Sequence, residues 1–249
     1  MKVVVLASGS KGNVTYVEEK GTRILIDIGK SCAYVEKKLK ELNINPNTIN
    51  AILITHTHID HIVGIGTFYK KYKPEIYIMP KMFPALSEYL SDFNCTYFTK
   101  ITQINDIRVN VIKTSHDVPD SVGFLMNDEL VYITDTGYLN DRYLPMLENK
   151  SMYIMESNHD IEMLYNGKYP YHLKRRIASD IGHLSNTDSS NYLSKIVGSN
   201  TKHIVLAHLS KENNTRDKAL ETLFNAIERT ENLDVVVAEQ DERTKVIEI

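Results

Sequence analysis

The chain has 249 residues and a mass of 28.5 kDa, with 29 basic and 32 acidic side chains and a formal net charge of −3 at pH 7. Hydrophobic residues make up 42% and charged residues 24%, an ordinary balance for a globular protein. No apolar run approaches the roughly 18 residues of a membrane span, which excludes an integral membrane protein. Proteins that bind a long duplex over their whole surface usually have an excess of basic residues, and this chain has none.

The first residues and the two cysteines indicate the cellular compartment of the protein. Val3 to Ala7 are only five consecutive apolar residues, shorter than a signal-peptide core, and they fit a first strand better. Cys32 and Cys95 cannot build a disulfide framework or, by themselves, a zinc ribbon. We therefore expect a cytoplasmic protein with no membrane insertion.

Apolar runs alternate with turn signals through most of the chain, which predicts many short strands. In chain order the predicted strands are Lys2–Leu6, Val14–Glu18, Arg23–Ile28, Ala51–Thr55, Glu75–Met79, Cys95–Phe98, Ile107–Ile112, Ser121–Met126, Leu130–Thr134, Ser151–Glu156, His203–Ala207, Asp234–Ala238 and Thr244–Ile249. Helical spacing or capping residues predict helices at Tyr34–Leu42, at Thr187–Val197 with Asn186 as N-cap, and at Arg216–Thr230. This order predicts two mixed sheets packed face to face with helices outside, in a single domain over residues 1–249.

The predicted strand Ala51–Thr55 runs directly into the sequence HTHIDH at positions 56–61. In an extended segment, residues two apart point the same way, so His56 and His58 can converge on one ion. A following helical turn would carry Asp60 and His61 round to face a second ion. Three imidazoles and a carboxylate within six residues indicate a metal site, since zinc binds both nitrogen and oxygen ligands. A zinc finger is excluded because neither cysteine lies near the cluster, and no HExxH motif is present.

Further ligands are expected at the ends of other strands, because two metal ions need about seven ligands between them. His116 follows the strand Ile107–Ile112, Asp135 follows Leu130–Thr134, and His208 follows His203–Ala207. Each residue alone is weak evidence. Together with the HTHIDH cluster they predict a dinuclear metal site.

With the sequence DIG at 27–29, these motifs resemble, in order, the metallo-β-lactamase superfamily. The resemblance implies an αββα sandwich with two metal ions at one edge, and zinc and manganese both suit such mixed ligands. The implied ligands are His56, His58 and His116 for the first ion, Asp60, His61 and His208 for the second, and Asp135 as a bridge. Asp27 would brace the HTHIDH segment without ligating a metal.

Within that superfamily, four motifs resemble the YycJ/WalJ family: SGSKGN at 8–13, ESNHD at 156–160, HDIEML at 159–164 and GHLSN at 182–186. This resemblance extends from Leu6 to about Ser210. Members are regarded as 5′-to-3′ exonucleases acting on DNA and are linked in many Gram-positive bacteria to a cell-wall two-component system. The resemblance therefore implies a nucleic-acid substrate, DNA in the first place, and a functional link to such a system.

The expected chemistry is hydrolysis by a hydroxide that bridges the two ions, because bound metals lower the pKa of water from 15.7 to about 7. A nucleotide 3′-oxygen is a poor leaving group, so a proton donor is expected. His183, just before the predicted helix Thr187–Val197, is the candidate general acid, and Glu156 would hydrogen-bond its far nitrogen. This pair resembles that of tRNA-processing zinc phosphodiesterases; alternatively, His183 only caps the helix. The expected catalytic residues are thus Asp60, His183 and Glu156.

Substrate contacts are expected from the first loop and from a basic stretch. They are Ser10, Gly12, Asn13, His159, Lys174 and Arg175. The loop can present backbone N–H groups to a phosphate, although a simple hairpin connection is an equal alternative. Lys174 and Arg175, with Arg176, can follow a single-stranded backbone, although at least one of the three is expected to lie on a plain solvated helix face. His159 either lines the phosphate pocket or braces Glu156.

Three other functions stay open at this point. The same site could hydrolyse a small cyclic phosphodiester or a thioester, although a thioester hydrolase should need no acid pair. It could belong to an RNA-processing nuclease. A metal-binding sensor without turnover is disfavoured, because a degenerate site is expected to have lost some of its ligands.

Overall fold

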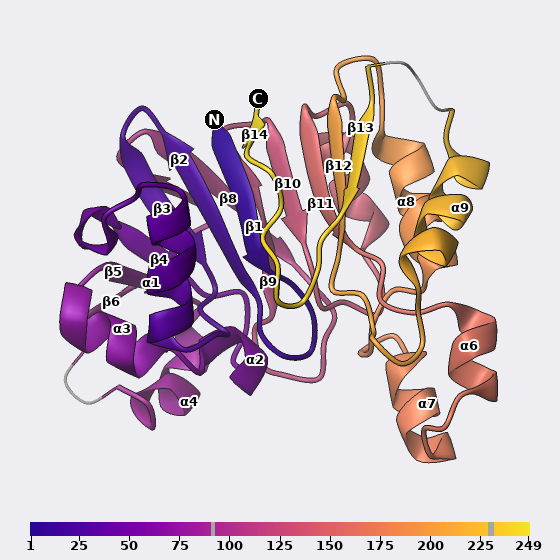
Figure 1. Cartoon of the computed structure of the whole chain (residues 1–249), viewed down its shortest axis with the longest axis horizontal. Helices are drawn as coiled ribbons and strands as arrows, with labels where there is room; N and C mark the ends of the chain where they lie inside the picture. Colours follow the sequence, from indigo (N-terminus) through magenta and orange to yellow (C-terminus); the bar gives the residue numbers. More distant parts are fainter. Residues whose placement is uncertain (91–92, 229–231) are drawn as a thin grey trace. The chain divides into compact units, whose positions relative to one another are not determined.

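The computed structural model describes residues 1–90, 93–228 and 232–249, which form two compact units. The first unit contains Met1–Val111, Val118–Val122 and Glu239–Glu248, and the second contains Ile112–Asp117, Gly123–Ala238 and Ile249. Figure 1 colours both units along the chain. Among the described residues, no helix is both long enough and apolar enough to cross a membrane.

The first unit is built on a seven-stranded sheet with the order β14-β1-β2-β3-β4-β5-β6. Its strands are β1 (Lys2–Ala7), β2 (Val14–Glu19), β3 (Thr22–Ile26), β4 (Ala51–Leu53), β5 (Glu75–Ile78), β6 (Cys95–Tyr97) and β14 (Ile247–Glu248). Strands β14 to β3 pair antiparallel, and β3 to β6 pair parallel. The β2–β3 hairpin turns at Lys20 and Gly21, which both have positive φ, as a tight two-residue turn requires.

Helices and a second hairpin complete the first unit. The helices are α1 (Cys32–Glu41), α2 (Ile59–Ile62), α3 (Ile65–Tyr72) and α4 (Phe83–Ser87), with 3₁₀ turns at Pro46–Thr48 and Pro80–Met82. The hairpin joins β7 (Ile101–Ile104) to β8 (Ile107–Lys113), whose last two residues belong to the second unit. Helix α1 begins earlier than predicted because the Ser31 side chain caps it. It buries Val35 and Leu39 on its inner face.

The second unit contains five strands in the order β13-β12-β11-β10-β9. They are β9 (Val122–Met126), β10 (Leu130–Ile133), β11 (Met152–Glu156), β12 (His203–Ala207) and β13 (Asp234–Val237), and all neighbours except β9 and β10 pair parallel. The helices are α5 (Leu144–Leu147), α6 (Ile161–Asn166), α7 (Tyr171–Ile177), α8 (Asn186–Ile196) and α9 (Arg216–Ala226), with a 3₁₀ turn at Asp141–Tyr143. Helices α8 and α9 cover one face of this sheet (Figure 1), and Leu193 and Leu223 lie in the same buried core as Tyr153.

The predicted fold class, two mixed sheets flanked by helices, is confirmed, but several element boundaries were wrong. Helix α8 is capped by Ser185, whose side chain accepts a hydrogen bond from Asp188 N, while Asn186 is already helical. Strand β3 stops at Ile26 because Asp27 has a left-handed φ of 58°. The predicted helix Arg216–Thr230 ends at Ala226, and its residues 229–230 lie outside the described chain.

Candidate functional site

Four of the predicted ligands lie on one short segment of the first unit, between the end of β4 and the end of α2. His56 and His61 are fully buried, while His58 and Asp60 are half-buried. Nε2 of His56 lies 3.2 Å from Nδ1 of His58, and the ring centroids of His56 and His61 are 3.9 Å apart. Imidazoles packed this closely, with ring nitrogens facing each other, are suited to sharing a bound cation.

Asp27 holds this segment in place from the end of β3. Its side chain is fully buried, and Oδ1 accepts a hydrogen bond from Thr55 N at 2.8 Å. Oδ2 accepts hydrogen bonds from Thr55 Oγ1 and from His61 Nδ1, both at 2.7 Å. Burial raises the pKa of Asp27, and the interactions with His61 and Thr55 oppose that effect. These contacts agree with the bracing role that the family resemblance implied.

Thr55 is a site residue that sequence reasoning missed. Because its hydroxyl donates to Asp27, the same oxygen accepts a hydrogen bond from His56 Nδ1 at 3.1 Å. Thr55 therefore connects the bracing carboxylate to the first histidine of the motif. Its place directly before HTHIDH was the only signal in the sequence.

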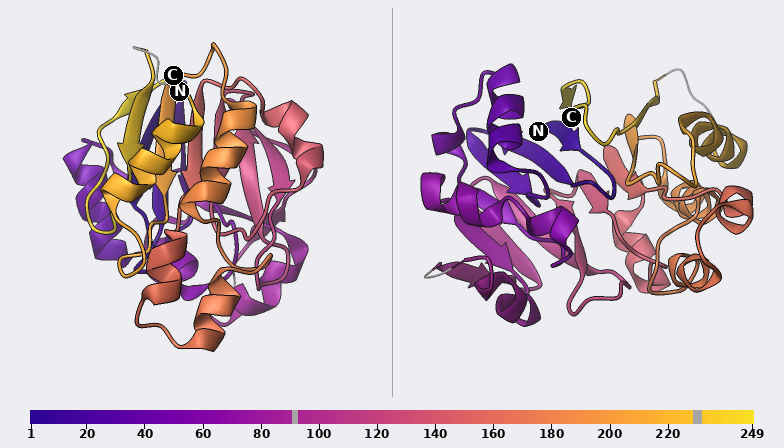
Figure 2. Two further views of the ribbon diagram at one scale, coloured as in Figure 1. Left: turned by 90° about the vertical axis from the view of Figure 1, so that its right-hand side faces the viewer. Right: turned by 60° about the horizontal axis from the view of Figure 1, so that its bottom comes forward.

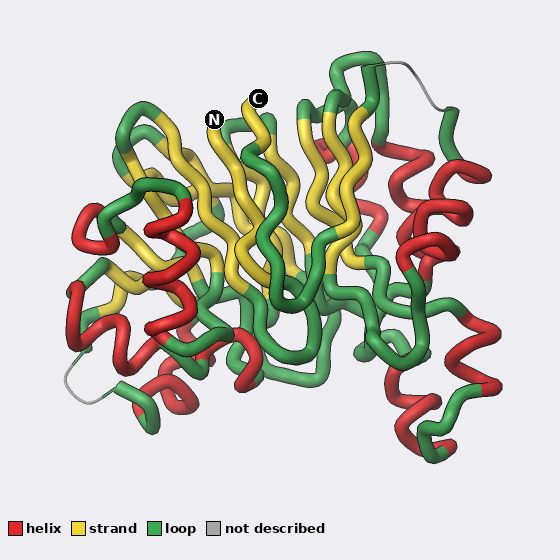
Figure 3. The backbone as a smooth tube through the Cα atoms, viewed as in Figure 1, coloured by secondary structure: helices red, strands yellow, loops and turns green. Residues whose placement is uncertain are grey.

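The second unit brings five predicted site residues toward the carboxyl edge of its strands. They are His116 after β8, Asp135 after β10, Glu156 at the end of β11, His183 before α8 and His208 after β12. Figure 3 shows loops leaving this edge of the sheet. One ligand atom from each of Asp135, Glu156, His183 and His208 lies within 4.8 Å of the others.

The backbone at two of these positions is unusual. Asp135 has a φ of 53° and His208 a φ of 56°, in the left-handed region that non-glycine residues rarely adopt. His208 directly follows the buried strand β12, and Asp135 lies two residues beyond the end of β10, so the chain turns sharply as it leaves the sheet. Backbone strain of this kind concentrates at functional sites.

Glu156 contacts two imidazoles of this group. Its side chain is fully buried, and Oε1 accepts hydrogen bonds from Nδ1 of His183 at 2.7 Å and from Nδ1 of His208 at 3.0 Å. Oε2 accepts hydrogen bonds from Thr136 N at 2.9 Å and Leu184 N at 3.2 Å. Burial raises the pKa of Glu156, but the histidines lower it more and hold it well below its usual range. The carboxylate is therefore ionised and orients both rings.

Four of the predicted histidine ligands share one arrangement, in which Nδ1 donates to an oxygen atom. The acceptors are Thr55 Oγ1 for His56, Asp27 for His61, the Gly182 carbonyl for His116 at 3.0 Å, and Glu156 for His208. Nε2 is then the unprotonated nitrogen, which is the form that ligates a metal. In each unit one of these histidines lies near a predicted carboxylate ligand, Asp60 beside His61 in the first unit and Asp135 beside His208 in the second. Mixed nitrogen and oxygen donors of this kind suit a divalent ion such as zinc or manganese.

The predicted substrate contacts of the first loop lie around Asn13. Ser10 is exposed, whereas Gly12 and Asn13 are buried. Asn13 Oδ1 accepts a hydrogen bond from Gly9 N at 2.8 Å, and its Nδ2 lies 3.0 Å from Nε2 of His61. Asn13 thus closes its own loop and reaches the HTHIDH segment.

The predicted contacts of the second unit have different surroundings. Burial lowers the pKa of His159 to about 4, so the ring is neutral, and a β-bridge pairs its backbone with Ser185. Lys174 donates to the Tyr165 carbonyl at 2.7 Å, which ties α7 to the end of α6. Arg175 is exposed.

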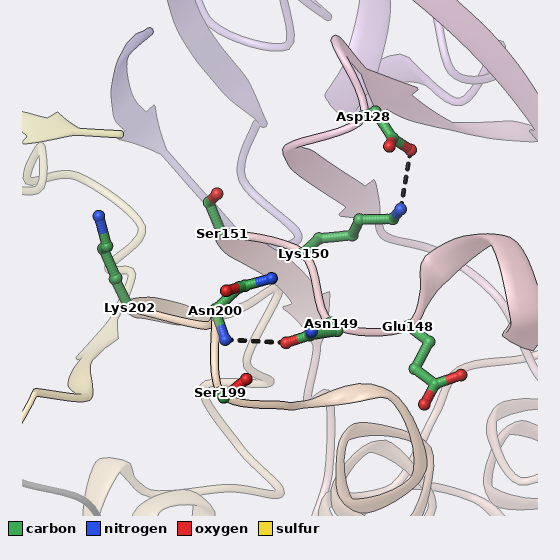
Figure 4. A pocket seen from close by; sticks show the side chains of 8 residues that line it. All are labelled: Asp128, Glu148, Asn149, Lys150, Ser151, Ser199, Asn200 and Lys202. Atoms are coloured by element: carbon green, nitrogen blue, oxygen red, sulfur yellow. Dashed lines mark hydrogen bonds and ion pairs between the residues drawn. The ribbon is translucent and has the colours of Figure 1, made fainter.

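A polar pocket with a volume of about 490 Å³ lies at the opposite, amino-terminal ends of β11 and β12 (Figure 4). It is lined by Asp128, Glu148, Asn149, Lys150, Ser151, Ser199, Asn200 and Lys202. None of the predicted site residues lines this pocket. Within the second unit, the candidate site is therefore the group at the carboxyl edge.

Comparison with known proteins identifies the family. Residues 10–175 match the family model described as Anti-Pycsar protein Apyc1. Exodeoxyribonuclease WalJ of Streptococcus pneumoniae serotype 2 is 39% identical over 236 residues, which cover 91% of this chain and 88% of that protein. This protein belongs to the WalJ/YycJ family. Another member, exodeoxyribonuclease YycJ of Bacillus anthracis, is 36% identical over 232 residues, with 90% and 88% coverage.

A solved structure places the family in its fold. The metallo-β-lactamase fold protein YhfI from Bacillus subtilis superposes with a TM-score of 0.75 at 16% identity, covering 98% of both chains. The chain therefore has the predicted metallo-β-lactamase fold. Family and fold together make this member of the WalJ/YycJ family a metal-dependent hydrolase, as the sequence predicted.

Proposed function

We propose that the protein is a 5′-to-3′ DNA exonuclease that works in the cytoplasm as one αββα domain and uses two divalent metal ions. The names of its WalJ and YycJ relatives support nucleic acid as the substrate. The observation that carries the proposal is the hydrogen bond between Glu156 and His183, because phosphodiester hydrolysis needs an acid for its poor leaving group. A link to a two-component system stays a prediction from the family.

The donor chemistry supports the predicted ligand sets. His56, His58 and His116 would hold one ion, and Asp60, His61 and His208 the other, with Asp135 shared between them. When bound, the ions supply an activated water and polarise the phosphate. Zinc and manganese both suit these ligands.

His183 gives a proton to the leaving oxygen. Its Nδ1 donates to Glu156 at 2.7 Å, so the ring is held in one orientation and Nε2 is the nitrogen that can face a substrate. The His183 side chain is 18% exposed, whereas Glu156 is fully buried. Glu156 is thus a positioning residue, and His183 is the group that reaches the substrate. Asp60, whose side chain is 20% exposed, accepts the proton of the attacking water.

The test is a cleavage assay on single- and double-stranded DNA labelled at the 5′ or the 3′ end, with zinc, manganese or EDTA. We expect metal-dependent shortening from the 5′ end. His183→Ala should lower kcat roughly 10²- to 10⁴-fold while both metal ions stay bound. The matched control is His203→Gln, a β12 histidine bonded to Asp234 at 3.2 Å, which should keep wild-type activity.

Two results would contradict the proposal. Loss of bound metal in His183→Ala would make His183 a ligand and remove it as the acid. A protein that holds two ions but cuts neither DNA nor RNA is not a nuclease, and small phosphodiesters and thioesters would then be the substrates to assay.

A further inference from the structure

Helices α6 and α7 form an arm, residues 161–177, at one end of the second unit (Figure 2). The arm contains four basic side chains and one acidic side chain, a net charge of +3. The rest of the chain has a net charge of −6, since the whole has −3. A positive surface on an otherwise acidic protein is suited to a polyanion.

Two aromatic rings are exposed on the arm. Tyr171 is 70% exposed and Tyr165 is 51% exposed. Arg175 lies one helical turn after Tyr171, and its guanidinium is 6.0 Å from the centre of that ring. Exposed aromatic rings beside cations are the combination that binds single strands, because every base has a face on which a ring can stack.

The basic side chains of α7 divide into two kinds. Lys174 bonds to the Tyr165 carbonyl within the arm, and Arg176 pairs with Asp117 outside it at 2.6 Å, so both side chains have partners in the protein. Arg175, by contrast, has no ion-pair partner among the residues that the structure describes. Its charge is therefore available to a phosphate.

The arm is attached to the loops of the candidate site. Asp117, the partner of Arg176, follows the predicted ligand His116. His116 in turn donates to the carbonyl of Gly182, in the segment between α7 and His183. A Cβ at Gly137 would lie only 2.3 Å from the backbone of Asp180 in that same segment. A nucleic-acid strand bound to the arm would therefore contact helix α7, which the segment 178–182 joins directly to His183, the proposed acid.

We propose that the arm binds single-stranded nucleic acid, with the Tyr171 ring stacked on a base and Arg175 contacting a phosphate. The inference rests on the proposed function for its choice of nucleic acid as substrate. It concerns binding, however, and is measured without turnover.

The experiment uses fluorescence anisotropy with the metal-loaded protein and a labelled phosphorothioate oligothymidylate, which keeps the backbone charge and resists hydrolysis. An abasic oligonucleotide of the same length and linkage is titrated in parallel. The variants are Tyr171→Ala, Tyr171→Phe and Arg175→Ala. Tyr89→Ala is the control for loss of an exposed ring, since Tyr89 is 43% exposed. Arg142→Ala is the control for loss of a cation over a ring, since Arg142 lies 4.8 Å from the Tyr143 ring.

We expect Tyr171→Ala to weaken oligothymidylate binding roughly tenfold and to leave abasic binding unchanged. Tyr171→Phe should bind like wild type, because stacking needs the ring and not the hydroxyl. Arg175→Ala should lower the slope of log K against log salt by about 0.7, the value for one phosphate contact on a single strand. Both controls should bind like wild type.

Wild-type binding by Tyr171→Ala overturns the proposal, as does an equal loss on the abasic strand. The cleavage assay described above is run separately on wild-type protein. Cleavage without any effect of Tyr171→Ala on binding refutes only the proposed binding role of the arm. Binding that depends on Tyr171, without cleavage, refutes only the proposed nuclease activity.

Discussion

Replacing Asp27 by asparagine tests how the HTHIDH segment, with its predicted metal ligands, is held in place. Asparagine tolerates the left-handed φ of 58° at this position and keeps an oxygen for Thr55 N. Its amide nitrogen, however, would face the two groups that now donate to Oδ2, Thr55 Oγ1 and His61 Nδ1. To accept from that amide, His61 has to move its proton to Nε2, which is the wrong form for a metal ligand.

The size of the effect follows from these contacts. Two buried hydrogen bonds are lost, at about 1–3 kcal/mol each. Burial already raises the pKa of Asp27, so removing its charge returns part of a desolvation penalty, and we expect a net loss near 2 kcal/mol. Asp27→Ala leaves three donors without an acceptor and adds about 1–2 kcal/mol for the left-handed backbone. The combined loss of stability from the three unpaired donors and the backbone is comparable with the roughly 5–15 kcal/mol that stabilises a typical protein. The alanine variant should therefore not fold.

The assay combines urea unfolding in EDTA with metal analysis after dialysis against zinc. Asp27→Asn should unfold at lower urea and retain less metal than wild type. Asp128→Asn is the control, because its ion pair with Lys150 at 2.8 Å is at the surface and contributes at most about 1 kcal/mol. An Asp27→Asn protein with wild-type unfolding and full metal content would refute the reasoning.

Two further predictions concern a glycine and a thiol. A Cβ at Gly29 would lie 1.6 Å from the Asp60 carbonyl oxygen, so Gly29→Ala should lose metal and more than about 3 kcal/mol of stability in urea unfolding. Gly21→Ala, which meets no atom within 4 Å, should lose only about 1 kcal/mol to its positive φ, and equal losses would contradict the steric argument. Burial raises the pKa of the Cys32 thiol to about 11, so about 10⁻³ of it is thiolate at pH 8. In a Cys95→Ser protein the reaction with a disulfide reagent should then be slow at pH 8 and speed up about tenfold per pH unit; fast labelling of the folded protein at pH 8 would contradict this.

The strands were predictable because most are apolar runs buried on both faces, such as β10 and β11. The short helices were not, since four to eight residues show too little of the helical period. Helix α7 buries no residue at all, so it has no apolar face to detect. The cap of α8 was misplaced by one residue because Ser185 and Asn186 are both good caps and only the backbone conformation decides between them.

For the candidate site too, some features could be predicted from the sequence and others could not. The HTHIDH segment could be recognised as a candidate metal site because the spacing of its side chains is local. The partner of His116 was not, because it is a backbone carbonyl 66 residues away, and a carbonyl has no sequence signature. The Glu156–His183 pair followed from the family resemblance, but the second contact of Glu156, with His208, emerges only from the fold.

That second contact has a consequence for how such proteins diverge. A lineage that came to use a substrate with a better leaving group would no longer need the imidazole at 183. Deleting it, however, leaves the buried Glu156 carboxylate with one hydrogen-bond donor fewer, and Oε1 then depends on the N–H of His208. Substitutions at Glu156, His183 and His208 should therefore be strongly epistatic, with double mutants departing from the sum of single mutants. Selection would be expected to keep or replace these three residues as one inherited unit.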